Sequence, residues 1–268
     1  MNLIQAIILG IVEGLTEFLP ISSTGHMALV SAVMGIQNSA FTTLFIETIQ
    51  FGTILSVVVL YWKKFIDFKG WKFYLKLFIA FLPAAAFGVV FKKHIDNLIS
   101  TPQFIAGSMF VGGIILLFVD NWFKQPKIET EEKISEKNAF IIGLFQVLAV
   151  VFPGLSRSAA TIIGGMQQKL TRKAAAEFSF FLAVPTLAGA FAKSIWDAMK
   201  DTPDILTGHN IFLLIVGNVV GFIVAIIAIK AFISYLTKHG FKVFGYYRIL
   251  IGGLIIVLLL AGVNLSIL

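Results

Sequence analysis

Two carboxylates, three hydroxyl groups and a histidine lie close together in an otherwise apolar stretch near the start of the chain. They belong to Glu13, Glu17, Ser22, Ser23, Thr24 and His26. Ionisable side chains at membrane depth are costly, so they usually face a cavity or a partner and mark a functional site. Glu13 and Glu17 share one face of a helix and repel each other unless a proton or a cation lies between them. Oxygen ligands of this kind suit Mg²⁺ or Ca²⁺.

The hydroxyl residues follow a proline and precede the apolar run Met27–Met34. A serine or threonine at this point would cap the helix that begins after the turn, and the N-terminal amides of that helix attract anions. Capping explains one hydroxyl group but not three in a row. His26 lies in the first turn of the same helix, close behind the carboxylates. A role as general acid, general base or nucleophile is therefore favoured over a purely structural one.

A second polar island lies near the middle of the chain, at Gln146 and in the sequence PGLSRS that follows it. Proline and glycine would bend the chain, and Ser156 and Ser158 can cap the next helix. Arg157 supplies a planar fork of donors suited to phosphate, with Thr161 one turn further on the same face. Alternatively, Arg157 only neutralises Glu13 or Glu17. One arginine cannot neutralise two carboxylates and a phosphate as well, so a metal cation would complete the charge balance.

The composition places these islands in a membrane. The chain has 268 residues, of which 58% are hydrophobic and 13% charged, and its mean hydropathy is +0.92. Ordinary soluble domains are about a quarter charged, so the composition predicts an all-α polytopic membrane protein. The net charge of +7 comes from short loops between apolar spans, which argues against a nucleic-acid partner. Because cysteine is absent, disulfides and thiolate metal sites are excluded.

The apolar stretches differ in continuity. Two of them, 2–36 and 138–168, are broken in the middle by proline, glycine and serine. Irregular backbone at membrane depth is tolerated only where it is buried in protein or lines a wet cavity, so we expect each to be a re-entrant pair of half-helices. The uninterrupted stretches are long enough to span a bilayer. They lie at about 41–61, 74–91, 104–122, 174–196, 211–233 and 247–265.

The two polar islands superpose when the sequence is shifted by half its length. A shift of 133 residues places Gly10 on Gly143, Glu13 on Gln146, Pro20 on Pro153 and Ser23 on Ser156. Each half, 1–134 and 135–268, would then hold one re-entrant pair and three spans. Because three is odd, the second half would be inverted, and such repeats typically place their site near the midplane. Chance coincidence of glycine and proline in an apolar chain is the alternative.

The positive charges predict the orientation. The loops 62–76, 123–137, 168–173 and 234–246, with Lys230 and Arg248 nearby, hold 16 of the 21 lysine and arginine residues. Since cytoplasmic loops are rich in these residues, we assign this side to the cytoplasm and the termini to the outer side.

These observations predict a midplane site with an anion pocket, carboxylates, a hydroxyl nucleophile and a histidine. Such a site suits hydrolysis of a phosphorylated lipid whose headgroup enters from the bilayer. The strongest alternative is a transporter or flippase for an anionic or lipid phosphate, because broken helices and inverted repeats are common in transporters. A purely structural membrane protein is a weaker alternative. The spacing of Gly217 and Gly221 could support helix contacts within a chain or in a homodimer, but it is too common to decide between them.

At these residues the sequence resembles the bacterial undecaprenyl pyrophosphate phosphatase family, the type linked to bacitracin resistance. The resemblance covers nearly the whole chain and rests on EGLTEFLPISSTGH (13–26) and PGLSRSAAT (153–161), with EFSFFLAVP (177–185) as a third stretch. It implies hydrolysis of undecaprenyl diphosphate to undecaprenyl phosphate at the outer face of the bacterial cytoplasmic membrane. The family's functional residues map onto Glu13, Glu17, Ser23, His26 and Arg157.

The resemblance leads to a mechanistic hypothesis. Ser23 would be the nucleophile, and Ser22 or Thr24 would donate to phosphate. Ser156, Ser158 and Thr161 would bind the phosphate together with Arg157. His26 or Glu17 would handle the proton, and attack by water with His26 as base is the main rival. A divalent cation on Glu13 and Glu17 would offset charge on the leaving phosphate.

Overall fold

The computed structural model describes residues 1–37, 39–67, 70–91, 95, 98, 101–263 and 265. Within these residues the regular elements are helices, joined at one place by an isolated backbone bridge between Ile128 and Leu170. The predicted all-α class is therefore confirmed. Three short elements lie in the connections: α4 (Trp62–Ile66), η1 (Glu131–Lys133) and η2 (Pro203–Ile205).

Six of the described helices are long and apolar enough to cross a membrane, as the sequence predicted. At about 1.5 Å per residue the two longest exceed the roughly 30 Å of a hydrocarbon core, so they extend beyond the predicted spans. The helix that comes last in the sequence ends at Leu260, five residues before the predicted end at 265. The protein is thus a multi-pass membrane protein. These helices are α3 (Ala40–Leu60), α5 (Trp71–Val90), α7 (Pro102–Trp122), α10 (Arg172–Asp201), α11 (Gly208–His239) and α12 (Lys242–Leu260).

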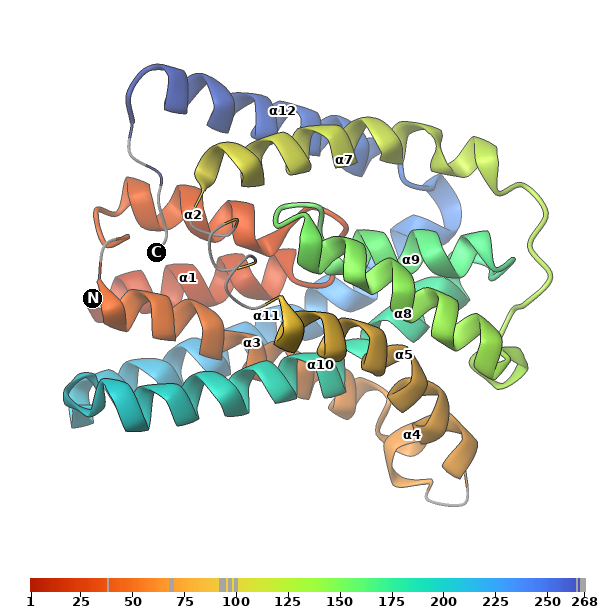
Figure 1. Ribbon diagram of the computed structural model, residues 1–268, viewed down its shortest axis with the longest axis horizontal. Helices are drawn as coiled ribbons and strands as arrows, with labels where there is room; N and C mark the ends of the chain where they lie inside the picture. Colours follow the sequence, from red (N-terminus) through yellow and green to blue (C-terminus); the bar gives the residue numbers. More distant parts are fainter. Residues whose placement is uncertain are drawn as a thin grey trace.

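Each of the two interrupted stretches forms a pair of short helices joined by a turn. The first pair is α1 (Leu3–Thr16) and α2 (Ser23–Val33), and the second is α8 (Glu136–Val151) and α9 (Arg157–Gln167). Figure 1 shows α1 and α2 at the end of the molecule that carries the termini and α8 and α9 at the other end. The turns face each other between them. The entry of each pair into a bilayer from one side stays a prediction.

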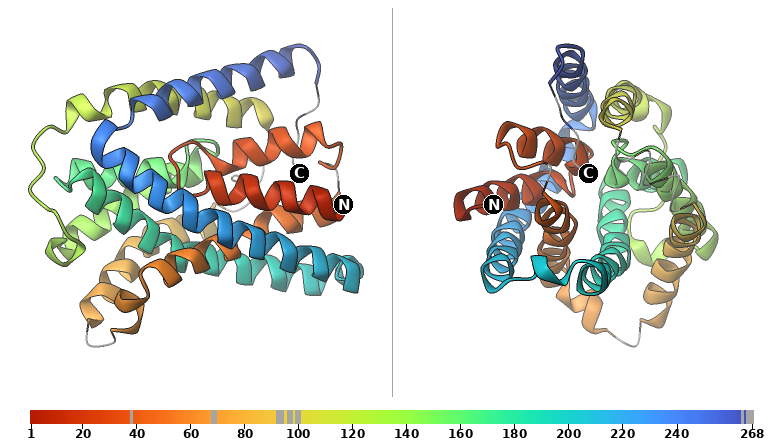
Figure 2. Two further views of the ribbon diagram at one scale, coloured as in Figure 1. Left: turned by 180° about the vertical axis from the view of Figure 1, so that it is seen from behind. Right: turned by 60° about the vertical axis from the view of Figure 1, so that its left-hand side comes forward.

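The contacts between helices have counterparts in the two halves of the chain. α1 packs on α11 as α8 packs on α5, and α3 packs on α10 at the centre. α7 and α12 lie side by side along one edge, as the views in Figures 1 and 2 agree. This correspondence favours the predicted division at 134/135, whose inversion across a bilayer stays a prediction.

Gly217 and Gly221 take part in a helix–helix contact within the chain. An added Cβ on Gly10 would lie 2.8 Å from the carbonyl oxygen of Gly217, and one on Gly14 would lie 2.7 Å from that of Gly221. The glycines therefore let α1 approach α11 closely. Their spacing gives no support to a homodimer, because the surface it forms is already covered.

Aromatic side chains anchor the first turn to the core. Phe18, in that turn, makes an edge-to-face contact with Phe180 of α10, with ring centroids 5.2 Å apart. Both side chains are fully buried, as are Phe178 and Phe181 on the same helix. Edge-to-face pairs are favourable beyond the area they bury, so α10 holds the turn at a fixed height in the bundle.

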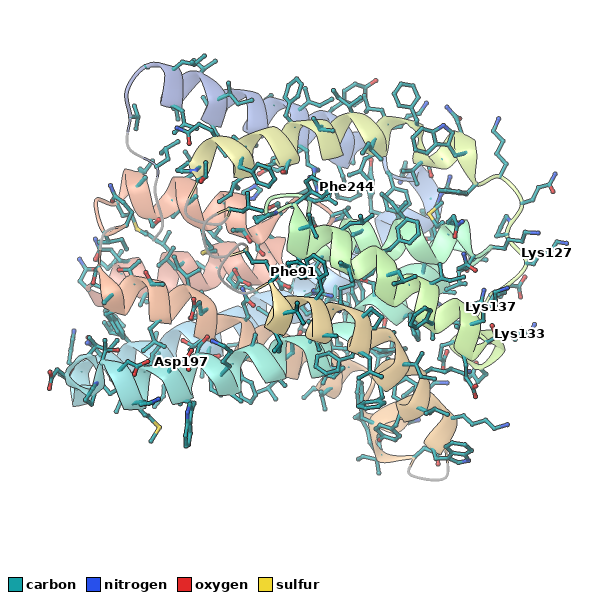
Figure 3. All side chains as sticks on the ribbon, in the orientation of Figure 1. Phe91, Lys127, Lys133, Lys137, Asp197 and Phe244 are labelled. Carbon is teal, nitrogen blue, oxygen red and sulfur yellow. The ribbon has the colours of Figure 1, made fainter. Side chains whose placement is uncertain are left out.

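Lysines gather at the end of the molecule opposite the termini. Figure 3 shows Lys127, Lys133 and Lys137 at that end, while Asp197 lies toward the end with the N-terminus. This distribution agrees with the charge pattern that led us to assign the lysine-rich end to the cytoplasm.

Candidate active site

A cavity of about 260 Å³ lies where the two turns meet. At about 30 Å³ for each water molecule, it has room for several waters or for the headgroup of a phosphorylated compound. Its polar lining comes from both turns and from α3. These residues are Glu17, Ser22, Ser23, Thr24, Gln50, Ser156 and Arg157.

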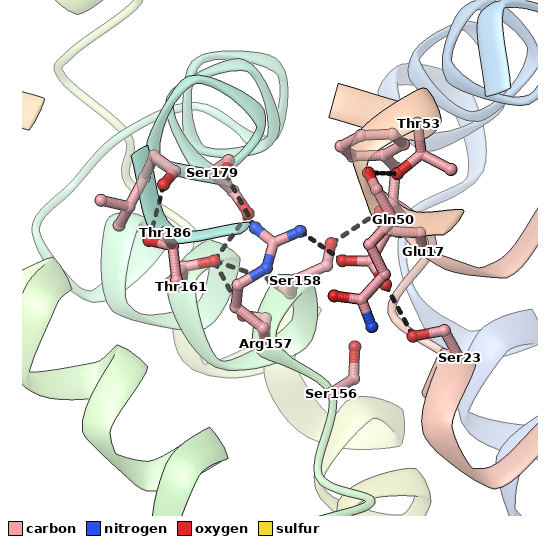
Figure 4. A network of polar contacts seen from close by, with 12 residues as sticks. Glu17, Ser23, Gln50, Thr53, Ser156, Arg157, Ser158, Thr161, Ser179 and Thr186 are labelled. Atoms are coloured by element: carbon pink, nitrogen blue, oxygen red, sulfur yellow. Dashed lines mark hydrogen bonds and ion pairs between the residues drawn. The ribbon is translucent and has the colours of Figure 1, made fainter. Parts of the chain in front are cut away.

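Glu17 is the centre of this cavity. Its Oε2 accepts a hydrogen bond of 2.6 Å from Ser23 Oγ, and its Oε1 accepts one of 2.8 Å from Arg157 Nη2. Figure 4 shows the carboxylate between these two side chains, with Gln50 beside it and Ser156 reaching toward the same space. A hydroxyl group at 2.6 Å from a buried carboxylate has the geometry expected of a nucleophile beside its base, and the catalytic role of Ser23 stays a prediction.

The turns present two helix N-termini to the cavity. Ser22 caps α2 by accepting from the Gly25 amide at 3.4 Å, and Ser156 caps α9 by accepting from the Ala159 amide at 3.3 Å. Both serines have positive φ, 71° and 75°. The first amides of a helix have no partner within it and favour anions, so both N-termini favour negative charge in the cavity.

The caps correct the predicted alignment of the two islands. Ser22, rather than Ser23, corresponds to Ser156, because the second turn has one more residue between its proline and its cap. Ser23 and Arg157 are then the first residues of α2 and α9. Thr24 lines the cavity beside Ser23, as expected for a phosphate donor, and that role stays a prediction.

Arg157 donates hydrogen bonds to two acceptors. Besides Glu17, it donates from Nη1 to the carbonyl oxygen of Ser179 at 3.1 Å. Its Nε is buried and has no hydrogen-bond partner among the described residues. A donor therefore remains for an incoming anion. Ser179 lies in the third stretch that carried the resemblance, which explains why that part of α10 belongs to the site.

Glu13 lies behind Glu17 on α1. It is fully buried, and neither of its carboxylate oxygens has a hydrogen-bond partner within the part of the chain that the structure describes. Glu17 is four residues away and interacts with it electrostatically. Two oxygens without partners beside a second carboxylate are suitable ligands for a hard divalent cation, and the metal site stays a prediction. Because the described residues gather no third histidine, cysteine or acidic ligand, further ligands would come from water and phosphate.

Two of the predicted phosphate ligands lie away from the cavity. Ser158 is fully buried and donates to the carbonyl oxygen of Phe18 at 2.6 Å, which ties α9 to the first turn. Thr161 is also fully buried and its hydroxyl contacts that of Ser179 at 2.6 Å. Both support Arg157 and the turns from behind, so the geometry does not favour direct phosphate contact for either residue.

His26 faces away from Ser23. Its Nδ1 lies 2.7 Å from the carbonyl oxygen of Ser22, and its Nε2 lies 2.7 Å from the hydroxyl of Tyr247 on α12. The ring does not line the cavity. Of the two groups predicted to handle the proton, the geometry therefore favours Glu17, and His26 supports the start of α2.

Three residues near the site escaped the sequence analysis: Gln50, Tyr247 and Arg248. The placement of Arg248 with the positive residues of the cytoplasmic side is wrong, because its side chain is fully buried. The signal was present in the sequence. Arg248 falls inside a predicted span, where an ionisable residue is a functional candidate by default, and Gln50 is a polar residue within another. The pattern does not say which face of its helix each one occupies.

Fold and site together define a class: a polytopic membrane protein whose buried polar site, built for anions, lies between two broken helix pairs. The chain belongs to the family of the bacitracin resistance protein BacA, whose family model matches residues 6–254.

Several curated relatives cover nearly the full length of the chain. An undecaprenyl-diphosphatase from Flavobacterium psychrophilum is 57% identical over 260 residues, covering 97% of this chain and 96% of the relative. One from Porphyromonas gingivalis is 50% identical over 283 residues and covers all of both chains. One from Bdellovibrio bacteriovorus is 48% identical, with 99% of each chain covered.

Proposed function

We infer that this protein is an undecaprenyl-diphosphatase, a membrane hydrolase that converts undecaprenyl diphosphate into undecaprenyl phosphate and inorganic phosphate. Family membership and the names of close relatives over the whole chain support this function. By that reaction it would recycle the carrier lipid of cell-wall synthesis, and bacitracin resistance follows from the family. One observation carries the inference from the structure: the hydroxyl of Ser23 lies 2.6 Å from Glu17, inside an anion-binding cavity.

The proposed first step is attack by Ser23 Oγ on the terminal phosphorus. The proton of the hydroxyl passes to Glu17, the phosphoanhydride bond breaks, and undecaprenyl phosphate leaves with that proton, which returns Glu17 to its ionised form. Arg157 Nε, with the amides at the starts of α2 and α9, would hold the phosphate oxygens as charge develops on them. Water then hydrolyses the phosphoserine, with Glu17 as base. Direct attack by water on the lipid remains the rival mechanism.

Glu13 and Glu17 would hold the divalent cation. When bound, Mg²⁺ or Ca²⁺ supplies positive charge for the phosphate oxygens. The unpartnered oxygens of Glu13 support this assignment. Arg157 and the buried Arg248 are two positive charges beside two carboxylates and a diphosphate, so the chain's own charges do not balance.

The cellular placement is also a proposal. We assign the protein to the bacterial cytoplasmic membrane, with the cavity open to the outer, periplasmic face. The lysines at the end opposite the termini support this orientation. A homodimer stays open.

The site favours hydrolysis over transport. A carrier or flippase for a phosphate needs donors such as Arg157, but it has little use for a hydroxyl held against a buried carboxylate. The relatives named above are hydrolases by name.

The test is release of phosphate from undecaprenyl diphosphate by detergent-purified protein. Glu17→Gln should abolish release, because the amide cannot take the proton of Ser23. Glu129→Gln is the matched control, since Glu129 is an exposed residue of the loop after α7 and does not line the cavity. No release by the unaltered protein under any cation condition would overturn the proposed function.

A further inference from the structure

Arg248 is a buried cation whose partners are all backbone carbonyls. Its Nε donates to Met109 at 3.1 Å. Each of the terminal nitrogens donates to two more carbonyl oxygens, so all five N–H groups of the guanidinium are used. Those of Nη1 go to Pro20 at 3.1 Å and Leu155 at 2.7 Å, and those of Nη2 go to Ser108 at 3.4 Å and Gly154 at 2.9 Å.

These acceptors belong to three separate segments. Pro20 lies in the first turn, Gly154 and Leu155 lie in the second, and Ser108 and Met109 lie on α7. One side chain from α12 therefore links both turns to one another and to a long helix. No carboxylate pairs with Arg248 in the described ranges of the chain. Removing a charged guanidinium from water costs free energy. We therefore expect the role of Arg248 to lie in the backbone segments that it holds in place.

Glycines on α7 make room for the guanidinium. A Cβ added to Gly112 would clash with Nη2 of Arg248 and would lie 3.0 Å from its Cζ. One added to Gly113 would lie 2.9 Å from its Cβ. Any side chain at these positions would push the arginine away from the turns, so the cradle is built for it.

We propose that Arg248 is the positioning residue that holds the two turns together, so that the N-termini of α2 and α9 face one cavity. It does not line the cavity. Any effect of Arg248 on the reaction rests on the proposed diphosphatase function and acts through the turns. Pro20 lies two residues before the cap Ser22. Leu155 lies next to the cap Ser156. Tyr247, the neighbouring residue on α12, adds a contact to the same turn through His26.

The direct test measures how far apart the two helices after the turns lie. The chain has no cysteine, so spin labels can be placed on cysteines at Val33 of α2 and Gln167 of α9, both exposed. Arg248→Ala should broaden the distance distribution between the labels measured by pulsed electron paramagnetic resonance. Arg248→Lys should not restore it, because lysine donates from a single nitrogen and cannot reach five carbonyls.

A second pair of variants acts on the cradle and leaves the arginine in the chain. Gly112→Ala should broaden the distribution in the same direction, whereas Gly107→Ala, on the same helix, should not. A Cβ at Gly107 has nothing within 4 Å. If Arg248→Ala gives no folded protein, this pair decides the question. Equal distributions for Gly112→Ala and Gly107→Ala would then overturn the proposal.

The kinetic readout is separate, because the distance measurement needs no substrate. With undecaprenyl diphosphate as substrate, Arg248→Ala and Gly112→Ala should lower kcat/KM at least tenfold while Gly107→Ala stays within twofold. Loss of activity with an unchanged distance distribution would overturn the positioning role. The distances could broaden in Arg248→Ala while neither the unaltered protein nor any variant releases phosphate. That outcome would leave the positioning role standing and overturn the proposed function.

Discussion

Ser23 and Arg157 occupy the same place in two different helices. Each is the first residue after a serine cap, in α2 and in α9, and each contacts one oxygen of the Glu17 carboxylate. The same position therefore carries a hydroxyl group in one turn and a cation in the other. One carboxylate from the first turn joins them.

Ser23→Ala should abolish a trapped phosphoenzyme, whereas His26→Ala should still form it. The reason is the geometry: the hydroxyl of Ser23 contacts Glu17, while both ring nitrogens of His26 are directed to Ser22 and Tyr247. Rapid acid quenching with lipid diphosphate labelled at the terminal phosphate checks this. Ser31→Ala is the control, since that hydroxyl donates to Ala28 within α2. Phosphate recovered on His26 would exclude Ser23 as nucleophile.

Arg157→Lys should lower kcat/KM by about a hundredfold, the scale expected when one fixed donor to a developing charge is lost. A lysine cannot hold Glu17 and the Ser179 carbonyl and still present a donor to phosphate. Steady-state phosphate release measures the effect. Arg172→Lys is the matched control, because Arg172 pairs with Asp120 at 2.7 Å outside the cavity. Near-normal activity of Arg157→Lys would remove the anion clamp from the mechanism.

EDTA should stop phosphate release, and added Mg²⁺ or Ca²⁺ should restore it. Glu13→Gln should raise the cation concentration needed for half-maximal activity, because it removes one of the two charged ligands while keeping the side-chain volume. Titration of activity against free cation gives the comparison, with Glu129→Gln again as control. Release that survives EDTA would leave the hydrolase but exclude the metal.

Acid should weaken the link between α4 and the loop before α8. The pKa of Glu132 is lowered to about 2, mainly because Lys64 donates to its carboxylate. Since this folded-state pKa lies below the ordinary 4.5, the contribution to stability is complete above pH 4.5 and is lost as the pH falls toward 2.

Lys64→Ala should accordingly flatten the pH dependence of the melting temperature in detergent on the acid side of neutrality. Lys137→Ala, an exposed lysine at the start of α8, should leave that dependence unchanged. An equal acid response in Lys64→Ala and in the unaltered protein would show that the pair does not contribute.

The fold could be predicted because a membrane constrains it strongly. An apolar run of some 20 residues has to be a helix. A single proline inside such a run can be accommodated, as Pro83 is in α5 and Pro185 is in α10, whereas proline clustered with glycine or serine favours a break. The breaks at 17–22 and 152–156 were therefore visible in the sequence. The full lengths of α10 and α11 were not visible in the sequence, because the polar ends of a helix carry no hydrophobic signal.

The candidate site was predictable where it is local. Glu17, Ser23 and Ser22 lie within one short segment, and the spacing alone brings them together. Gln50 and Arg248 come from distant helices, and the partners of Arg248 are carbonyl groups, which every residue has. Sequence cannot point to a contact of that kind. Only the packing of α7, α12 and the two turns reveals it.

The helix that carries Arg248 follows both turns in the order of the chain. During synthesis, α1, α2, α8 and α9 therefore leave the ribosome and enter the membrane before the side chain that links their turns has been made. Until α12 has been synthesised, the carbonyl groups of Pro20, Gly154 and Leu155 lack the guanidinium donor of Arg248. We therefore expect the cavity between the two turns to be completed only after α12 has packed against α7.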